Sequence, residues 1–231
     1  MRILMIGAMK QEVEKLKSLI NSHQKNQLID ITYWHGKINQ HDILLCQSGI
    51  GKVNAAVTSS LLIDKYNPDL IINIGSAGGI AKNVQIGDIV MATELNYHDV
   101  DVTAFGYQKG QIPDMPEHFK TDKIFVEKIK ANNEKNNNKL KLQFGLMLSG
   151  DSFINSNDKV QQIKEAFPTA LALDMESTVI SQVCYKFNKP FVIIRTVSDH
   201  ADNTSDTDFS TKLIEVSNNL ASQLVAIIEK L

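Results

Sequence analysis

Short apolar runs alternate along the chain with longer stretches in which apolar residues recur every three or four positions. Runs of about four to eight residues are typical of buried strands, and a period of about 3.6 residues is typical of helices that pack one face against a sheet. This pattern predicts strands at Ile3–Ala8, Ile29–His35, Asp42–Gln47, Leu70–Ile74, Ile89–Thr93, Gln143–Leu148, Ala170–Leu173 and Phe191–Val197. It predicts helices at about Gln11–Ile20, Val53–Tyr66, Ile124–Lys130, Lys159–Ala166, Glu176–Phe187 and Ser210–Lys230.

This alternation favours one α/β domain over residues 1–231, a three-layer αβα sandwich with a central mixed, largely parallel sheet. Two segments do not follow the pattern. Residues 131–141 are rich in Asn and Lys and are interpreted as a solvated loop between a helix and a strand. Residues 96–120 carry aromatics and prolines with little periodicity, as long functional loops often do.

Composition limits the classes of function. With 43% hydrophobic and 22% charged residues the chain has the balance of a soluble globular protein. The net charge of -2 gives no general attraction to nucleic acid or to acidic membranes. No apolar run approaches the ~20 residues that span a bilayer, and the apolar start is interpreted as a strand and not as a signal peptide. Cys46 and Cys184 lie in apolar runs without CxxC spacing, which favours two free thiols in a reducing cytoplasm.

Candidate chemistry follows four of the predicted strands. In open α/β sheets, ligands bind beyond the carboxyl ends of the strands. Polar or glycine-rich groups stand at such ends in Met9-Lys10-Gln11-Glu12, Gly75-Ser76-Ala77-Gly78-Gly79, Asp174-Met175-Glu176 and Ser198-Asp199.

Each of these groups also has a plain structural interpretation. Glu12 and Glu176 fall in predicted first helical turns, where acids favour the helix macrodipole, and Asp199 could cap a turn. The segments "GSAGG" and "SGIGKVNAA" lack the spacing of dinucleotide or P-loop motifs. Three carboxylates at three strand ends nevertheless indicate a site, because buried acids must be paired, solvated or functional. Arg195, inside the last predicted strand, is interpreted as a partner that orients carboxylates or a water.

The same residues carry a resemblance to a known family. The segments run in order from Met1 to at least Phe209 and read "IGAMKQEVEKL", "SGIGKVNAA", "NIGSAGG", "GDSFI", "ALDMES" and "PFVIIRTVSDHAD". Together they resemble the 5'-methylthioadenosine/S-adenosylhomocysteine nucleosidases of the nucleoside phosphorylase-like superfamily. The resemblance implies hydrolysis of the N-glycosidic bond of both nucleosides to adenine and a 5-thio-substituted ribose, without metal or organic cofactor. It implies a cytoplasmic role in methionine salvage and in removal of the methyl-cycle product.

The resemblance also implies residue roles. Asp199 resembles the general acid at adenine N7, and Glu12 the carboxylate that activates the attacking water. Ser76 and Arg195 resemble the residues that help to place this water, and Glu176 resembles the carboxylate that binds the ribose hydroxyls. Breaking a ribosyl C–N bond builds positive charge on the sugar and negative charge on the base, so the chemistry needs an acid and a base. An aspartic acid needs a raised pKa to hold its proton near neutrality.

The remaining substrate contacts are implied in the same way. They comprise the adenine stacking residue Phe153, the backbones of Ile154 and Met175, the base-lining Ala77 and Gly78, Ser198, and the apolar wall of Met9, Ile50 and Phe209. Phe105 and Pro113 resemble residues donated across a homodimer interface to the neighbouring pocket. Asp174 stands where relatives often have Glu, and Ser177, Thr178 and His200 also depart from common choices. A lone apolar residue is more often core than site, so only the motif context favours the wall.

Three other functions remain open. A nucleoside phosphorylase shares the fold but must bind phosphate, typically through arginines in glycine-rich loops. Arg2 and Arg195 are the only arginines and neither stands in such a loop, which favours hydrolysis. A nucleosidase acting on a modified futalosine is a closer alternative. A non-catalytic nucleoside sensor is disfavoured, because binding alone would not need the acid and base together.

Overall fold

The computed structural model describes residues 1–135, 141–203, 205–229 and 231. Its elements in chain order are β1 (Arg2–Gly7), α1 (Lys10–Leu19), β2 (Asn21–Leu28), β3 (Ile31–Ile38), β4 (His41–Gln47), α2 (Lys52–Tyr66), β5 (Leu70–Gly79), β6 (Ile89–Tyr97), the 3-10 turn η1 (Thr103–Phe105), β7 (Phe119–Lys120), α3 (Lys123–Glu134), β8 (Leu142–Ser149), α4 (Asn157–Ala166), β9 (Ala170–Asp174), α5 (Ser177–Lys186), β10 (Phe191–Asp199) and α6 (Ser205–Ile228).

The strands form one mixed sheet with the order β10-β6-β8-β9-β5-β1-β4-β3-β2, and β7 pairs with β6. The centre is parallel, because β1 runs parallel to β4 and β5, and β5 runs parallel to β10. Since β10 pairs with both β5 and β6, the strands β5, β10, β6, β8 and β9 also close into a ring. The ring brings the carboxyl ends of β5, β9 and β10 together: Gly78 is paired with both Leu173 and Asp199.

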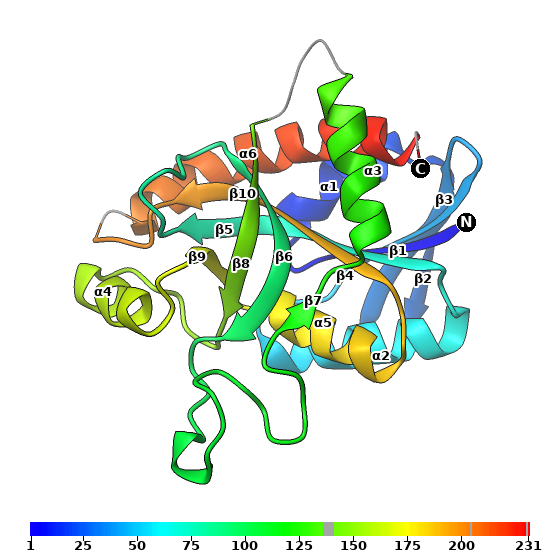
Figure 1. Cartoon of the computed structure of the whole chain (residues 1–231). Coiled ribbons are helices and arrows are strands. Elements are labelled where there is room, and N and C mark those ends of the chain that lie inside the picture. The colour runs from blue at the N-terminus through cyan, green and yellow to red at the C-terminus, as the bar shows by residue number, and fades with distance from the viewer. Residues whose placement is uncertain (136–140, 204, 230) are drawn as a thin grey trace.

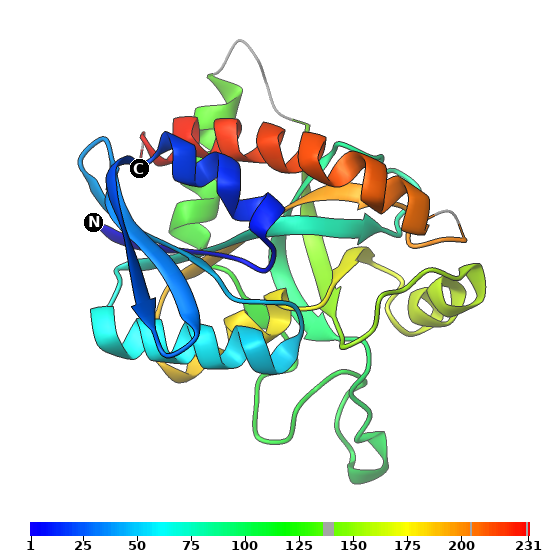
Figure 2. The same cartoon turned by 180° about the vertical axis from the view of Figure 1, so that it is seen from behind.

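Helices cover both faces of the sheet, as the sequence predicts. Helices α1, α3 and α6 lie on one face and α2 and α5 on the other (Figure 1), and α1 and α6 run side by side (Figure 2). On the first face Leu16 and Leu224 belong to a core with the apolar side chains of β1, β4 and β5. On the second face Leu62 and Ile180 belong to the other core. The predicted three-layer α/β domain is therefore confirmed, and the closed ring is an addition to it.

The strand expected at Ile29–His35 begins two residues later. Ile29 has a left-handed backbone with φ 57°, and it stands in the turn that joins β2 to β3. Strand β2 itself was not predicted, because its sequence NSHQKNQL has one apolar residue and lies exposed at the sheet edge. Such a strand gains its order from ladder hydrogen bonds and leaves no apolar run to detect.

The strand expected at Leu70–Ile74 continues through "GSAGG", a segment whose glycines allow either a tight turn or a close approach of the backbone to another group. This segment is the second half of β5, whose residues Gly75–Ala77 pair with Arg195–Val197 of β10. Ser198 and Asp199 likewise belong to the end of β10, and Asp174 is the last residue of β9. Because β5 gains partners on both sides, its backbone stays extended through a composition that normally predicts a turn.

The two irregular segments contain more structure than expected. Between Asn96 and Lys120 the chain completes β6, makes the short turn η1 and adds β7. Helix α3 continues to Glu134, so the loop expected at 131–141 begins later; residues 136–140 lie outside the described part. Within the described ranges, no helix combines the length and the apolar character needed to cross a membrane.

Candidate active site

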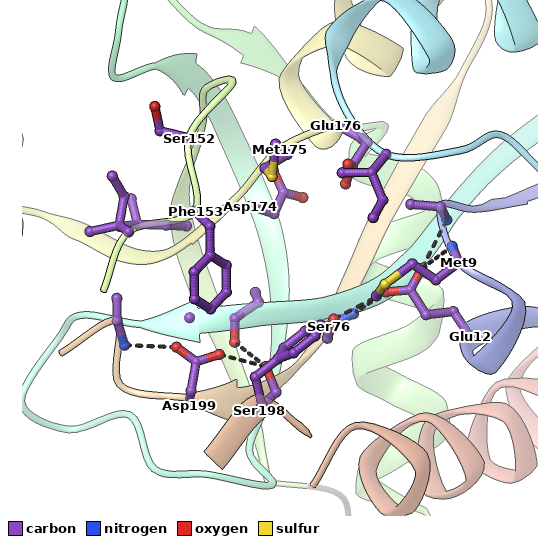
Figure 3. A pocket seen from close by; sticks show the side chains of 18 residues that line it. Met9, Glu12, Ser76, Ser152, Phe153, Asp174, Met175, Glu176, Ser198 and Asp199 are labelled. Carbon is purple, nitrogen blue, oxygen red and sulfur yellow. Dashed lines mark hydrogen bonds between the residues drawn. The ribbon is translucent and has the colours of Figure 1, made fainter. Parts of the chain in front are cut away.

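A cavity of about 340 Å³ lies at the carboxyl ends of β1, β5, β9 and β10 (Figure 3). Thirteen of the residues expected at the site line it: Met9, Glu12, Ile50, Ser76, Ala77, Gly78, Phe153, Ile154, Met175, Glu176, Ser198, Asp199 and Phe209. Arg195 does not line it and lies behind its wall with 1% exposure. Phe105, which is 80% exposed, and Pro113 lie outside this cavity.

Glu12 joins the start of α1 to the middle of the sheet. Its Oε2 accepts hydrogen bonds from the N–H groups of Ala8 and Met9, at 2.8 and 3.0 Å. Its Oε1 accepts from the N–H and the hydroxyl of Ser76, at 2.9 and 3.1 Å. The helix-start interpretation is therefore correct for Glu12, but it is incomplete, because the same buried carboxylate faces the cavity. Four donors hold it as a fixed acceptor.

Gly75 makes room for this arrangement. A Cβ atom at this position would lie 2.0 Å from Nη1 of Arg195 and 2.6 Å from Oε1 of Glu12. No side chain other than hydrogen fits where a guanidinium and a carboxylate approach the backbone this closely. The glycine in "GSAGG" thus reflects close approach to charged groups and not a turn.

Arg195 is the counter-ion of two buried acids. Its Nη2 lies 2.8 Å from Oδ2 of Asp174 and 3.7 Å from Oε2 of Glu176. Nη2 also donates to Oδ1 of Asn73 at 2.7 Å, and Nε donates to the hydroxyl of Ser177 at 3.0 Å. The charge of Arg195 inside a core strand is tolerated because the guanidinium is paired with acids and hydrogen-bonded. The expectation that Arg195 orients carboxylates fits this geometry.

Three polar residues around this ion pair were not among the expected site residues. Ser149 donates its hydroxyl to Asp174 Oδ1 at 2.5 Å, the hydroxyl of Ser177 donates to Asp174 Oδ2, and Asn73 bridges Ser177 and Arg195. Asp174, whose side chain is shorter than the Glu that relatives often have here, is thus held by two hydroxyls as well as by the guanidinium. Asn73 is the one of these with a usable sequence signal, because it interrupts the apolar run "LIINIG".

Glu176 is the residue just before α5, which begins at Ser177, one residue later than the helix predicted at Glu176–Phe187. Its Oε1 accepts the N–H of Gly51 at 2.9 Å. Burial raises the pKa of Glu176 to about 7, and the neighbouring carboxylates of Asp174 and Glu12 add to the rise against the opposing effects of Arg195 and the Gly51 N–H. Glu176 therefore gains and loses its proton near neutrality.

Asp199 stands away from Glu12 and Glu176 across the cavity, beside Phe153 (Figure 3). Its Oδ1 accepts the N–H of Ala201 and its Oδ2 accepts the hydroxyl of Ser198, both at 2.8 Å. The rings of Phe153 and Phe209 meet edge to face at 5.6 Å on the same cavity. The cavity thus has one end suited to a flat base and another suited to hydroxyl groups. Among the described residues, no three His, Cys, Asp or Glu side chains gather closely enough to hold a metal ion.

The superfamily of the chain follows from comparison with known protein families. A model of the phosphorylase superfamily matches residues 2–231, so the chain belongs to that superfamily.

The relatives narrow the assignment. A 5'-methylthioadenosine/S-adenosylhomocysteine nucleosidase from Haemophilus influenzae (strain PittEE) is 45% identical over 231 residues, which is 100% of both chains. The structure of such a nucleosidase from Neisseria meningitidis in complex with methylthio-immucillin-A has a TM-score of 0.96 and 39% identity over 100% of this chain and 99% of the other. The enzyme from S. pneumoniae with the transition-state inhibitor MT-ImmA has a TM-score of 0.95 and 38% identity, with the same coverage. The chain belongs to this nucleosidase family and is an N-glycosyl hydrolase.

Proposed function

We propose that the chain hydrolyses the N-glycosidic bond of 5'-methylthioadenosine and S-adenosylhomocysteine, releasing adenine and the 5-thio-substituted ribose. One observation carries the proposal: Glu12, Glu176 and Asp199 line a single cavity whose other walls are largely apolar. The names of the relatives and the nucleoside-like inhibitors in their structures support the same substrates. The apolar walls can pack against an adenine ring and a thioether. The three carboxylates lie where they can contact a ribose and the departing base.

The proposed role of Asp199 is to protonate the departing base. When the bond between C1' and N9 breaks, its electron pair moves into the adenine, and the proton of Asp199 goes to N7. Oδ1 faces the Ala201 N–H, which can only donate, whereas Oδ2 faces a hydroxyl that can also accept, and this favours Oδ2 as the oxygen that carries the proton. The Ser198 hydroxyl contacts Oδ2 and fixes the direction of the carboxyl group. General acid catalysis of this kind contributes about 10²–10⁴ in rate.

The proposed role of Glu12 is to activate the water that attacks C1'. Water bonds to C1' through oxygen and gives one proton to the Glu12 carboxylate, so the sugar gains the hydroxyl that completes hydrolysis. Because Glu12 is locked by the N–H groups of Ala8, Met9 and Ser76, it needs no reorganisation as the sugar becomes cationic.

The proposed role of Glu176 is to accept the ribose hydroxyls and to stabilise the positive charge that develops on the sugar. Arg195, which is itself paired with Asp174, lies 3.7 Å from the Glu176 carboxylate, and the Gly51 N–H donates to the same carboxylate. The backbone of Met175 lies on the same stretch of the wall. This arrangement makes Arg195 a positioning residue for the ribose carboxylate, with any effect on water exerted through its neighbours.

Phosphorolysis would need a site for phosphate, which proteins usually build with arginine. Both arginines of this chain already have carboxylate partners. Arg195 pairs with Asp174, and Arg2 pairs with Asp42 at 2.8 Å at the amino end of the strands, opposite the cavity. Water is therefore the favoured acceptor of the ribosyl group.

The proposal includes a homodimer that completes each cavity. Phe105 is 80% exposed in the turn η1, and Pro113 is exposed further along the same loop. Single exposed apolar residues are common on protein surfaces, so the support for this contact is the family resemblance together with the exposure of both residues. In a dimer these two residues would cover the 5'-thio end of the partner's cavity. We place the enzyme in the cytoplasm, where its free buried cysteines stay reduced and where it would serve methionine salvage and remove the methyl-cycle product.

The test compares turnover with binding. Glu12→Gln and Asp199→Asn are each expected to lower kcat for adenine release from methylthioadenosine by about 10²–10⁴. Both are expected to bind a 7-deaza analogue, which has carbon in place of N7, within about tenfold of the parent affinity. The parent enzyme should bind this analogue without cleaving it, because Asp199 has no nitrogen to protonate. Active Glu12→Gln and Asp199→Asn variants, or rapid cleavage of the 7-deaza compound, would contradict these roles.

A further inference from the structure

Three side chains outside the cavity connect the loops that carry its wall. Lys52 begins α2, Asp99 follows β6, and Asp151 follows β8. None of the three lines the cavity. We refer to Lys52, Asp99 and Asp151 as the loop clamp.

The contacts of the clamp form a closed triangle. The Lys52 ammonium group lies 2.6 and 2.8 Å from the two carboxylate oxygens of Asp99. Asp99 Oδ2 also accepts the N–H of Asp151 at 3.0 Å. Asp151 Oδ1 in turn accepts the N–H of Lys52 at 2.8 Å. Each residue is thus held by the other two, and the three loops cannot move apart without breaking charge-assisted hydrogen bonds.

The clamp is partly withdrawn from water. The side chains of Lys52 and Asp99 are 24% and 29% exposed, and the Lys52 ammonium group also lies 4.7 Å from the centre of the Tyr97 ring. Burial opposes the ionisation of Asp99, but the hydrogen bonds from Lys52 and Asp151 outweigh it and hold the pKa of Asp99 below its usual value. Such a pair is worth more than a fully exposed surface salt bridge.

The loops joined by the clamp carry two groups of the site, the Gly51 N–H and the Phe153 ring. Gly51 immediately precedes Lys52 and donates its N–H to Oε1 of Glu176 at 2.9 Å. Its φ of 93° is a backbone conformation that glycine adopts readily. On the other side of the triangle, Phe153 lies two residues after Asp151.

We propose that the loop clamp positions the Gly51 N–H on the Glu176 carboxylate and holds the loop that carries Phe153, so that Asp99 is a positioning residue for the nucleoside site. The inference rests on the proposed function, because it assigns the clamp a role in binding ribose and base. Breaking the Lys52–Asp99 pair would loosen both loops at once without replacing any residue that lines the cavity.

The pH dependence gives the clamp a distinctive signature. Glu176 faces Arg195, Asp174 and Glu12 as charged groups, and the Gly51 N–H is the contact that the clamp controls. Losing this N–H removes one donor that favours the ionised carboxylate, so the acidic limb of kcat/KM would move to higher pH. Asp99 faces Lys52, Asp151 and His98.

His98 does not account for such a movement. Burial lowers the pKa of His98, and the charge of Asp99 opposes this effect, so Asp99→Asn would move the pKa of His98 further down. An upward shift of the acidic limb in Asp99→Asn therefore reports on Glu176 and not on His98.

The first experiment is independent of catalysis. Hydrogen–deuterium exchange is measured on Asp99→Asn and Lys52→Met, of which the second keeps the Lys52 backbone N–H and the length of the side chain. Asp42→Asn is the matched control, because Asp42 is 30% exposed and pairs with Arg2 and His35 at the opposite end of β4. Faster uptake in the segments 48–53 and 150–154 is expected in the two clamp variants but not in the control. Unchanged uptake in both segments would overturn the clamp.

The second experiment measures kcat and KM from pH 5 to 9 on the same variants. Asp99→Asn and Lys52→Met should each raise KM for methylthioadenosine about tenfold at pH 6 and shift the acidic limb upward. The double variant should be no worse than either single one, because the pair acts as a unit. An unmoved acidic limb, or an equal loss in Asp42→Asn, would overturn the positioning role. If the parent enzyme releases no adenine, the proposed function fails, and the exchange experiment still decides whether the clamp exists.

Discussion

At the scale of single residues, the site depends on a few buried charges that stabilise one another. Arg195 compensates Asp174 and Glu176, while Glu12 is satisfied by backbone N–H groups and by Ser76. Uncompensated charges at such depth are costly, so removing one partner affects the rest. Buried charge is therefore both the structural support of the site and the source of its chemistry.

Replacing Arg195 tests this dependence. Arg195→Met is expected to lower the free energy of unfolding by about 3–5 kcal/mol at pH 8, because it leaves Asp174 and Glu176 buried without a counter-ion. At pH 5 the loss should be smaller, since Glu176, with a pKa of about 7, is then protonated. Urea unfolding of the parent and of Arg195→Met at both pH values measures this loss of stability. Lys130→Met removes a surface ion pair with Glu127 and should cost less than about 1 kcal/mol. Equal losses in the two variants would contradict the account.

Glu176 predicts the pH dependence of ligand binding. Ribose hydroxyls donate to the ionised carboxylate, so binding below the free pKa of about 7 must release a proton. The affinity for the 7-deaza analogue should therefore rise with pH up to about 7 and then level off. Titration calorimetry in two buffers of different ionisation enthalpy measures both the affinity and the proton release. In Glu176→Gln the profile should be flat; an affinity that falls as pH rises from 5 to 7 would contradict the assignment.

The sequence predicts individual residues where a motif surrounds them and misses those that act through tertiary contacts. Glu12, Glu176 and Asp199 stand at strand ends, where ligand sites are expected. Ser149 and Ser177 gave no comparable signal, because a serine in a strand or a helix is common and its partner Asp174 is fixed only by the fold. The role of Gly75 also becomes visible only once Arg195 and Glu12 approach it.

At the scale of elements, the site collects the beginnings of helices. Glu12 lies in the first turn of α1, Gly51 precedes α2, and Glu176 precedes α5. Helix amino ends carry unpaired N–H groups and partial positive charge, which favour nearby carboxylates. Three short connections after strands therefore deliver both the acids and some of the donors that hold them.

Helix α3 offers a test of an element that lies apart from the site. The Asp122 carboxylate accepts the N–H groups of Ile124 and Phe125, at 2.9 and 3.1 Å, and so caps the helix. Asp122→Ala should lower the free energy of unfolding by about 1 kcal/mol with unchanged kcat/KM. Asp122→Asn keeps an effective cap and is the control, with an expected change of a few tenths of a kcal/mol or less. A stability loss in Asp122→Asn as large as that in Asp122→Ala would argue against the cap.

Element centres were predictable and element ends were not. The apolar runs of β1, β4 and β10 mark strands whose interior is largely buried on both faces. The second half of β5 reads as a loop, yet pairing with β10 and β9 holds it extended. The polar β2 lies at the sheet edge, where no burial pattern is required. The difference in both cases comes from neighbours distant in sequence.

At the scale of the whole molecule, ring closure of five strands concentrates the functional groups, and a second chain is proposed to complete the cavity. Phe105 has no place in the cavity of its own chain. Its position on an exposed loop was predicted from the family resemblance, whereas the closed ring was not, because strand order depends on pairings that no local pattern encodes.

Mixing two impaired variants tests the shared cavity. Asp199→Asn lacks its own acid but still presents Phe105, while Phe105→Ala keeps its acid and lacks the aromatic. If Phe105 serves the partner's cavity, equal mixtures allowed to exchange subunits should recover about a quarter of the parent activity, because half of the dimers hold one complete site. Ile124→Ala, which shortens another exposed apolar side chain, is the control for Phe105→Ala and should stay active. Activity that only averages the two variants would contradict the shared site.

Adenine release from methylthioadenosine, measured with purified enzyme in phosphate-free buffer and again with added phosphate, distinguishes hydrolysis from phosphorolysis. We expect equal rates in both buffers and free methylthioribose as the sugar product, because water is the acceptor and both arginines are paired with carboxylates. Release that requires phosphate and yields the sugar 1-phosphate would contradict the proposed hydrolysis.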